Sequence, residues 1–156
     1  MEAKTNAIRL LDKAKIEYKA YTYKPTGQIT GAEAAEALGK APESVFKTLV
    51  TVGKSKTYYV FMIPVLKELD LKKCAAAVGE KSVEMIKAKE LLPITGYIHG
   101  GCSPLGMKKQ FDTVIDISAQ DQKIIIFSGG KIGCQIQTTL AELAKVLKYK
   151  LAKITL

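Results

Sequence analysis

Hydrophobic and polar positions recur along this chain with two different periods, which predict short helices interspersed with strands. Strand-like patterns lie at residues 16–23, 44–51, 57–63, 113–117 and 123–128. Helical spacing or helix-capping residues mark 5–15, 30–38, 70–78, 87–92 and a segment that starts at residue 139. Residues 82–86 are compatible with a strand or a helix. Because no repeat, low-complexity tract or linker divides the chain, we expect a single domain over residues 1–156.

The central prediction concerns the strand at residues 44–51, which carries a lysine among apolar residues. The apolar residues fall on both faces of a period-2 strand, so both faces should be covered. They are Val45, Phe46, Leu49 and Val50. Burying an ammonium group is costly unless it is paired or lines a wet cleft, so we expect Lys47 to point at something polar. The alternative is a lysine that reaches from an edge strand to bulk water.

Turn and capping residues set the expected limits of several elements. Residues 53–56 should form a hairpin turn, and Pro64 should end the second strand of that hairpin because proline cannot donate to a sheet. Asp70 should cap a helix that stops at Gly79. The next helix should break before Pro93.

Two further helices carry a capping box, and one of them follows a predicted turn. Residues 24–27 have turn chemistry, and Thr30 with Glu33 should open an alanine-rich helix that Gly39 ends. The last helix should start at Thr139. Its expected buried residues are Leu140, Leu143, Ala144 and Leu147.

Two glycine-rich segments, at 95–106 and 128–133, are candidates for a ligand-binding backbone. Glycines allow positive φ and close approach, and exposed N–H groups in such turns can bind an anion. Neither segment contains the pattern of a nucleotide-binding P-loop. The alternative is that the glycines only turn tight corners between strands.

The chain has an excess of positive charge, with 24 Lys and Arg residues against 15 Asp and Glu, a net charge of +9. This balance favours a polyanionic partner. Arg9 is the only arginine, and lysine meets phosphate as a mobile point charge, which suits backbone contact more than base reading. The alternative is a lysine-rich surface that binds no nucleic acid.

The inventory of nucleophiles and metal ligands is sparse. The three cysteines, Cys74, Cys102 and Cys134, form no Cys-x-x-Cys pair, and His99 is the only histidine. We therefore expect no metal site, no cofactor and no disulfide framework. Cys102 with His99 is a weak candidate for a nucleophilic pair, because no orienting carboxylate is identified. What remains is a site of backbone N–H groups, hydroxyls and one strand lysine, which can polarise a carbonyl without a protein nucleophile.

The location expected from the sequence is the cytoplasm. No run of 18 or more apolar residues predicts a membrane-spanning helix, and the N-terminal residues lack the apolar core of an export signal. We therefore expect no membrane partner.

Several segments, in order and spacing, resemble the YbaK/EbsC family. They are Val45-Phe-Lys-Thr-Leu-Val50, Leu69-Asp-Leu-Lys-Lys73, Val83-Glu-Met85, Thr95-Gly-Tyr97, Gly100-Gly-Cys-Ser-Pro-Leu-Gly106, Ser128-Gly-Gly130 and Gly133. Members are free-standing relatives of the editing domain of bacterial prolyl-tRNA synthetases. The resemblance implies an α/β fold of the α+β type, with short helices around a curved, mainly antiparallel or mixed β-sheet.

The same resemblance implies an activity and a set of site residues. The activity is hydrolysis of mischarged tRNA in trans, with Cys-tRNA(Pro) as the substrate of the most similar members and prolyl-tRNA synthetase as a possible partner. The substrate's own thiol would attack the ester, so no cofactor is implied. Lys47, Gly101 and Ser103 match the catalytic positions. The implied substrate-binding residues are Tyr23, Thr30, Thr48, Pro64, Pro104, Ser128, Gly129, Gly130 and Gln135.

Two of these residues depart from the family pattern. An acidic residue is expected where the chain has Gln135, and a bulky aromatic residue where it has Thr30. Both should lie at the pocket, so the preferred amino acid stays open. The oligomeric state stays open as well, because no sequence feature bears on it. A non-catalytic tRNA-binding or synthetase-associated module with the same fold is the alternative function.

Overall fold

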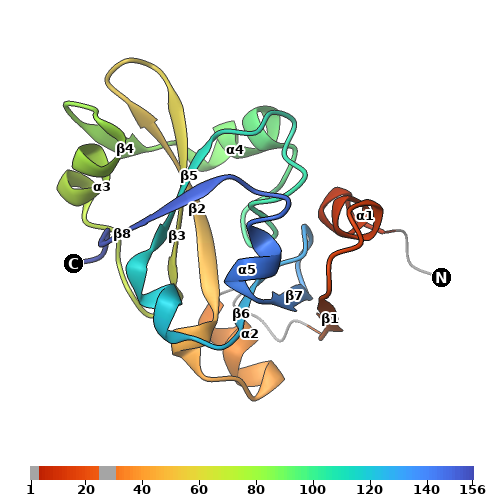
Figure 1. Ribbon diagram of the computed structural model, residues 1–156. Helices are drawn as coiled ribbons and strands as arrows, with labels where there is room; N and C mark the ends of the chain where they lie inside the picture. The colour runs from red at the N-terminus through yellow and green to blue at the C-terminus, as the bar shows by residue number, and fades with distance from the viewer. Residues whose placement is uncertain (1–3, 25–30) are drawn as a thin grey trace.

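The computed structural model describes residues 4–24 and 31–156, which form short helices around two β-sheets (Figure 1). The helices are α1 (Asn6–Lys13), α2 (Gly31–Leu38), α3 (Leu71–Val78), α4 (Ala88–Thr95) and α5 (Leu140–Leu143). The strands are β1 (Lys19–Thr22), β2 (Phe46–Gly53), β3 (Tyr58–Pro64), β4 (Val83–Met85), β5 (Asp112–Asp116), β6 (Ile125–Ser128), β7 (Cys134–Thr138) and β8 (Tyr149–Ala152). Two 3-10 helices lie at Pro42–Ser44 and Ile117–Asp121.

The larger sheet has five strands in the order β4-β2-β3-β5-β8, and the smaller one has three in the order β1-β7-β6. Four of the six strand pairs in the described residues are antiparallel, whereas β5 pairs in parallel with β3 and with β8. A parallel bridge between Val45 and Ile126 joins the start of β2 to β6. The predicted mixed α/β fold is confirmed.

The main core lies between the two sheets and is closed by α1 and α5. Phe46 and Met62 from the large sheet meet Phe127 and Ile136 from the small one, and all four are buried. A second cluster on the opposite face of the large sheet packs Phe61 and its neighbours under α3. Figure 1 shows α3 and the small sheet on opposite sides of the large sheet. Strand β2 is therefore covered on both faces, as its apolar pattern predicted.

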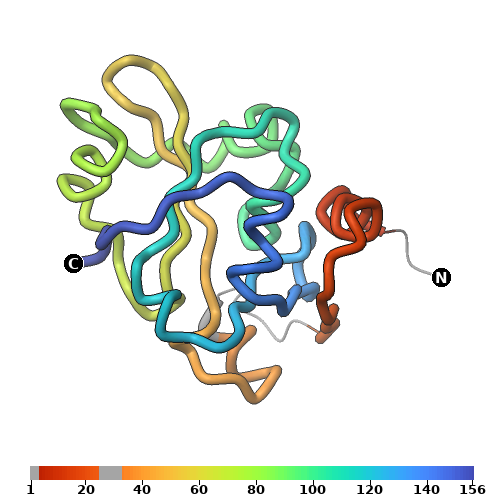
Figure 2. Tube along the Cα trace, viewed as in Figure 1, coloured from red at the N-terminus to blue at the C-terminus, as the bar shows by residue number. Residues whose placement is uncertain are grey.

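The 128–133 turn of the small sheet lies against the start of α1, as the trace in Figure 2 shows. The Thr5 hydroxyl donates to the carbonyl of Gly129 and also accepts a hydrogen bond from the N–H of Ile8 as the N-cap of α1. The N-terminal helix is thus tied to the same turn that the sequence marks as a candidate site.

Most of the predicted element limits are confirmed. Strands β2 and β3 form an antiparallel hairpin that ends at Pro64. The carboxylate of Asp70 accepts hydrogen bonds from two N–H groups at the start of α3, and Gly79 ends that helix with φ of 74°. Gly39 follows α2 with φ of 64°, whereas the predicted 24–27 turn and Thr30 cap fall at least partly outside the described residues.

Two predicted limits are wrong. Helix α4 continues through Pro93 to Thr95. Proline removes only one backbone hydrogen bond of the helix. The Thr95 hydroxyl and the Gly96 N–H still donate to carbonyls of the preceding turn, which stabilises the last turn of α4. Helix α5 has only four residues, so Ala144 is exposed, whereas Leu143 and Leu147 are buried as expected.

Asp116 at the end of β5 holds the C-terminal segment in place. It is 4% exposed, and its two oxygens accept hydrogen bonds from the N–H groups of Ser118 at 3.2 Å and Ile154 at 3.1 Å.

We predict that Asp116→Ala lowers the free energy of unfolding by about 2–4 kcal/mol, because it leaves a buried backbone N–H unpaired. Urea denaturation measures this change. Asp112→Ala, at an exposed position of the same strand, is the control and should change stability by less than about 0.5 kcal/mol. Equal losses in the two variants would contradict the assignment.

Candidate active site

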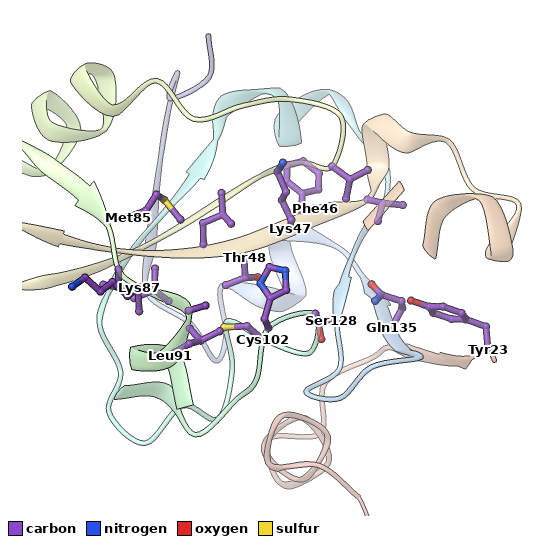
Figure 3. A pocket seen from close by; sticks show the side chains of 18 residues that line it. Tyr23, Phe46, Lys47, Thr48, Met85, Lys87, Leu91, Cys102, Ser128 and Gln135 are labelled. Atoms are coloured by element: carbon purple, nitrogen blue, oxygen red, sulfur yellow. The ribbon is translucent and has the colours of Figure 1, made fainter. Parts of the chain in front are cut away.

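A cavity of about 560 Å³ opens beside β2, where the large sheet meets the small one. The described part of its wall is formed by β2, the β4–α4 corner, the loop after α4, the facing residues of the small sheet, and Val65 after β3 (Figure 3). Its size falls within the range of sites that hold small molecules or the end of a larger substrate. The cavity is therefore the natural candidate for the functional site.

Strand β2 contributes two adjacent polar side chains. Figure 3 shows that Lys47 and Thr48 leave the strand in opposite directions, as the alternation of a strand requires. Lys47 is half-buried at the cavity wall, and its amine makes no hydrogen bond or ion pair within the described residues. The Thr48 hydroxyl is buried and has no partner in the described chain either. Both groups are thus available to a ligand.

The small sheet contributes Tyr23, Ser128 and Gln135. Tyr23 lies just after β1, where its N–H donates to the carbonyl of Gly133 at 2.9 Å. Burial raises the pKa of the Tyr23 hydroxyl, a hydrogen bond with the Gln135 side chain opposes this rise, and the charge of Glu33 adds to it. Gln135 itself is 6% exposed, so this amide is a fixed polar group of the wall.

The two glycine-rich turns pack directly against each other. A side chain at Gly101 would meet the backbone of residues 131 and 132 at 3.0–3.2 Å, and one at Gly129 would overlap the Cys134 sulfur. Gly130 adopts φ of 103°. Close packing therefore requires these glycines. This agrees with the alternative that glycines in the two segments turn tight corners between strands.

Several N–H groups in these turns are already used inside the protein. Gly101 donates to the Ile98 carbonyl, Gly129 to the Cys134 carbonyl, and Gly130 to the Ser128 hydroxyl. Within the described chain, the N–H groups of Gly100 and Cys102 have no such partner, and both residues line the cavity. These two are the backbone donors that remain for a ligand.

The structure brings together five of the predicted site residues and separates the others. Tyr23, Lys47, Thr48, Ser128 and Gln135 line the cavity. Thr30 lies outside the described residues. The predicted residues that do not line the cavity are Pro64, Gly101, Ser103, Pro104, Gly129 and Gly130. Ser103 is fully buried, with its hydroxyl accepting a hydrogen bond from Leu105 N–H, so it supports the loop.

The cavity also has lining residues that the sequence did not assign to a site. Met85, Lys87 and Leu91 come from the β4–α4 corner. Met85 ends one of the segments that resemble the YbaK/EbsC family, but no site role was assigned to it or to the other two. His99 and Cys102 come from the first glycine-rich segment. They stood out in the sequence only as a weak nucleophilic pair, because their common position at the cavity depends on the tertiary fold.

The chemistry of the wall argues against a protein nucleophile. Burial raises the pKa of the Cys102 thiol to about 12, so this group stays protonated near neutral pH. No Asp or Glu is among the described lining residues, and the described chain holds no group of three residues suited to a metal ion. The cavity can hold a polar or anionic group with cations, hydroxyls and backbone donors.

No helix in the described ranges has the length and apolar character needed to cross a membrane. The four lysines near the C-terminus, Lys145, Lys148, Lys150 and Lys153, are all exposed.

Solved structures with the same fold cover nearly the whole chain. The hypothetical protein APE2540 is 24% identical, with a TM-score of 0.88 over 97% of this chain and 100% of the other. A protein described as "a putative trans-editing enzyme for prolyl tRNA synthetase" is 23% identical, with a TM-score of 0.84 over 99% of each chain. At these identities the likeness establishes the fold.

Sequence comparisons establish the family. A protein of Enterococcus faecalis named "Putative Cys-tRNA(Pro)/Cys-tRNA(Cys) deacylase EbsC" is 45% identical over 155 residues, which is 99% of this chain and 94% of that protein. The model of the aminoacyl-tRNA editing domain matches residues 26–146. The chain therefore belongs to the aminoacyl-tRNA editing domain family, within which its sequence resembles the YbaK/EbsC proteins.

Proposed function

We propose that this protein is a trans-editing deacylase that hydrolyses mischarged tRNA, with Cys-tRNA(Pro) as its main substrate. The observation that carries this proposal is the 45% identity, over nearly the full length of both chains, to the protein named for Cys-tRNA deacylation. The net charge of +9 and the exposed C-terminal lysines suit contact with tRNA phosphates. The expected place of action is the cytoplasm, in association with prolyl-tRNA synthetase.

The cavity would hold the aminoacyl ester and the terminal adenosine of the tRNA. The Lys47 amine has no hydrogen bond or ion pair in the described chain and lies on a flexible stem at the wall, so it would bind ester oxygens or the adenosine phosphate. The Thr48 hydroxyl, buried and unpaired in the described chain, would hydrogen-bond the ester end. The substrate supplies the partners that these groups lack.

Cleavage would use the thiol of the substrate cysteine in place of a protein nucleophile. The thiol would attack the ester carbonyl and form a thiolactone, which water then opens. The N–H groups of Gly100 and Cys102 would stabilise the oxyanion, a contribution of about 3 kcal/mol per donor in known sites. This route agrees with a wall whose cysteine has a pKa of about 12.

Deacylation of a panel of charged tRNAs tests the proposed function. We expect Cys-tRNA(Pro) to be hydrolysed faster than Ala-, Ser- or Pro-tRNA(Pro), because only cysteine carries the attacking thiol. Salt-sensitive tRNA binding without turnover of any of the four would support the non-catalytic module instead.

Replacing Lys47 tests the role of the strand lysine. Lys47→Ala should lower the rate of Cys-tRNA(Pro) deacylation about 100-fold, which corresponds to about 2.7 kcal/mol, because the cation that holds the substrate is lost. The melting temperature should stay close to that of the parent, since the amine has no partner in the described protein. Lys54→Ala, at an exposed position in the β2–β3 turn, serves as the charge-matched control. Unchanged turnover in Lys47→Ala would remove this residue from the mechanism.

Replacing Cys102 tests the absence of a protein nucleophile. Cys102→Ala should retain most of the deacylation rate, within about threefold, because a thiol with a raised pKa does not attack at neutral pH and the backbone N–H is kept. Single-turnover kinetics measure the rate. Complete loss in a folded variant would instead favour a Cys/His mechanism.

A further inference from the structure

The proposed reaction needs a group that accepts a proton, because a thiol attacks as its thiolate. Five described residues with titratable side chains line the cavity: Tyr23, Lys47, Lys87, His99 and Cys102. No carboxylate is among the described lining residues, so the usual acidic bases are missing from the wall.

Four of the five groups are poor proton acceptors near neutral pH. Burial raises the pKa of Tyr23 and Cys102, so each already holds its proton. Lysine side chains are ordinarily cations at this pH and accept no further proton. Histidine is the side chain that ordinarily exchanges a proton in this range.

The backbone holds His99 at the cavity. The N–H of Gly101 donates to the carbonyl of Ile98 at 2.9 Å, and Gly100 has φ of 87°. This pattern is that of a type II turn in which His99 is the second residue. A side chain at this position projects outward from the corner of the turn. Gly101 packs against the backbone of Lys131, so the turn is fixed to the second glycine segment. The His99 side chain is exposed at the wall and lies next to the free N–H of Gly100.

We propose that His99 is the general base of the reaction and accepts the proton of the substrate thiol. This inference rests on the proposed function. The neutral imidazole takes the proton as the sulfur–carbon bond forms, and the ester carbon–oxygen bond breaks as the tetrahedral intermediate collapses. The imidazolium then returns the proton to the leaving 3′ oxygen of the tRNA. Atoms and charge balance, with thiolactone and free tRNA 3′-hydroxyl as products and no further reactant.

The charged groups that the described residues place at the cavity or behind its wall define what the pH dependence reports. They are Lys47 and Lys87 on the cavity wall, Lys131 behind Gly101, and Glu33, whose charge acts on Tyr23. Lysines and carboxylates ordinarily titrate far from neutrality, so a change of rate between about pH 6 and 7.5 reports the imidazole or the substrate amine. A His99 variant separates these two, since the substrate amine is the same in both enzymes.

Single-turnover deacylation of Cys-tRNA(Pro) as a function of pH tests the proposal. For the parent, the rate should rise with pH through the neutral range and then level off, as expected of a reaction that uses a histidine base. His99→Gln should be about 100-fold slower at pH 7, and its rate should rise instead toward about pH 8.5, where the substrate thiol ionises unaided. Added imidazole should restore part of the activity of His99→Ala.

Ile98→Ala is the matched control, because Ile98 is exposed in the same turn but does not line the cavity. It should keep the parental rate and pH profile. The proposal is overturned if His99→Gln raises only KM, if its rate falls equally at every pH, or if imidazole does not rescue His99→Ala. If the parent itself fails to deacylate Cys-tRNA(Pro), the proposed function is wrong. The panel of charged tRNAs detects that outcome before any His99 variant is measured, so it is not confused with a wrong role for His99.

Discussion

The cavity depends on the junction of the two sheets at the bridge between Val45 and Ile126. This bridge brings the start of β2 next to β6, and the following residue, Phe46, is buried in the core between the sheets. Lys47 and Thr48 come directly after this anchored pair, so their positions are set by burial of apolar residues beside them. A polar site built on a rigid strand in this way holds its groups in place at little entropic cost on binding.

The glycine-rich turns contribute packing and donors at the same time. Gly101 lets the first turn approach the second so closely that a Cβ would lie 3.0–3.2 Å from the backbone of residues 131 and 132, and Gly129 avoids a clash with Cys134 of its own turn. Their own N–H groups are consumed in holding these turns, whereas Gly100 and Cys102 keep theirs at the cavity wall. The structural and the functional interpretation of the glycine-rich segments therefore both hold. Some of their residues pack the two turns together, and this packing leaves the backbone N–H groups of other residues at the cavity wall.

Some parts of the fold could be predicted from local sequence patterns, and others could not. The hairpin of β2 and β3 and the cap at Asp70 follow from contacts between residues close in sequence, so their patterns were sufficient. Strand β8 was missed as well, and its partner is the distant strand β5. Strand β7 was also missed, although it forms a local antiparallel hairpin with β6 in addition to its nonlocal pairing with β1.

The same distinction applies to the candidate site. Lys47 was predictable because a lysine in an apolar strand has to be explained, and the family resemblance placed Tyr23 and Ser128 near it. Lys87 and Met85 were not predictable, since only the tertiary fold brings the β4–α4 corner to the cavity. Ser103 was expected at the site, but its burial gives it a supporting position.

The proposed function requires that this cavity receives the aminoacyl end of tRNA. NMR mapping of the intact protein with an amide-linked cysteinyl-adenosine, which the enzyme cannot cleave as an ester, tests this placement directly. We expect the largest shifts of backbone amide resonances at Thr48, Cys102, Ser128 and Gln135. Shifts confined to a separate cavity, which Thr113 and Tyr149 line, would contradict this placement, as would the absence of saturable shifts.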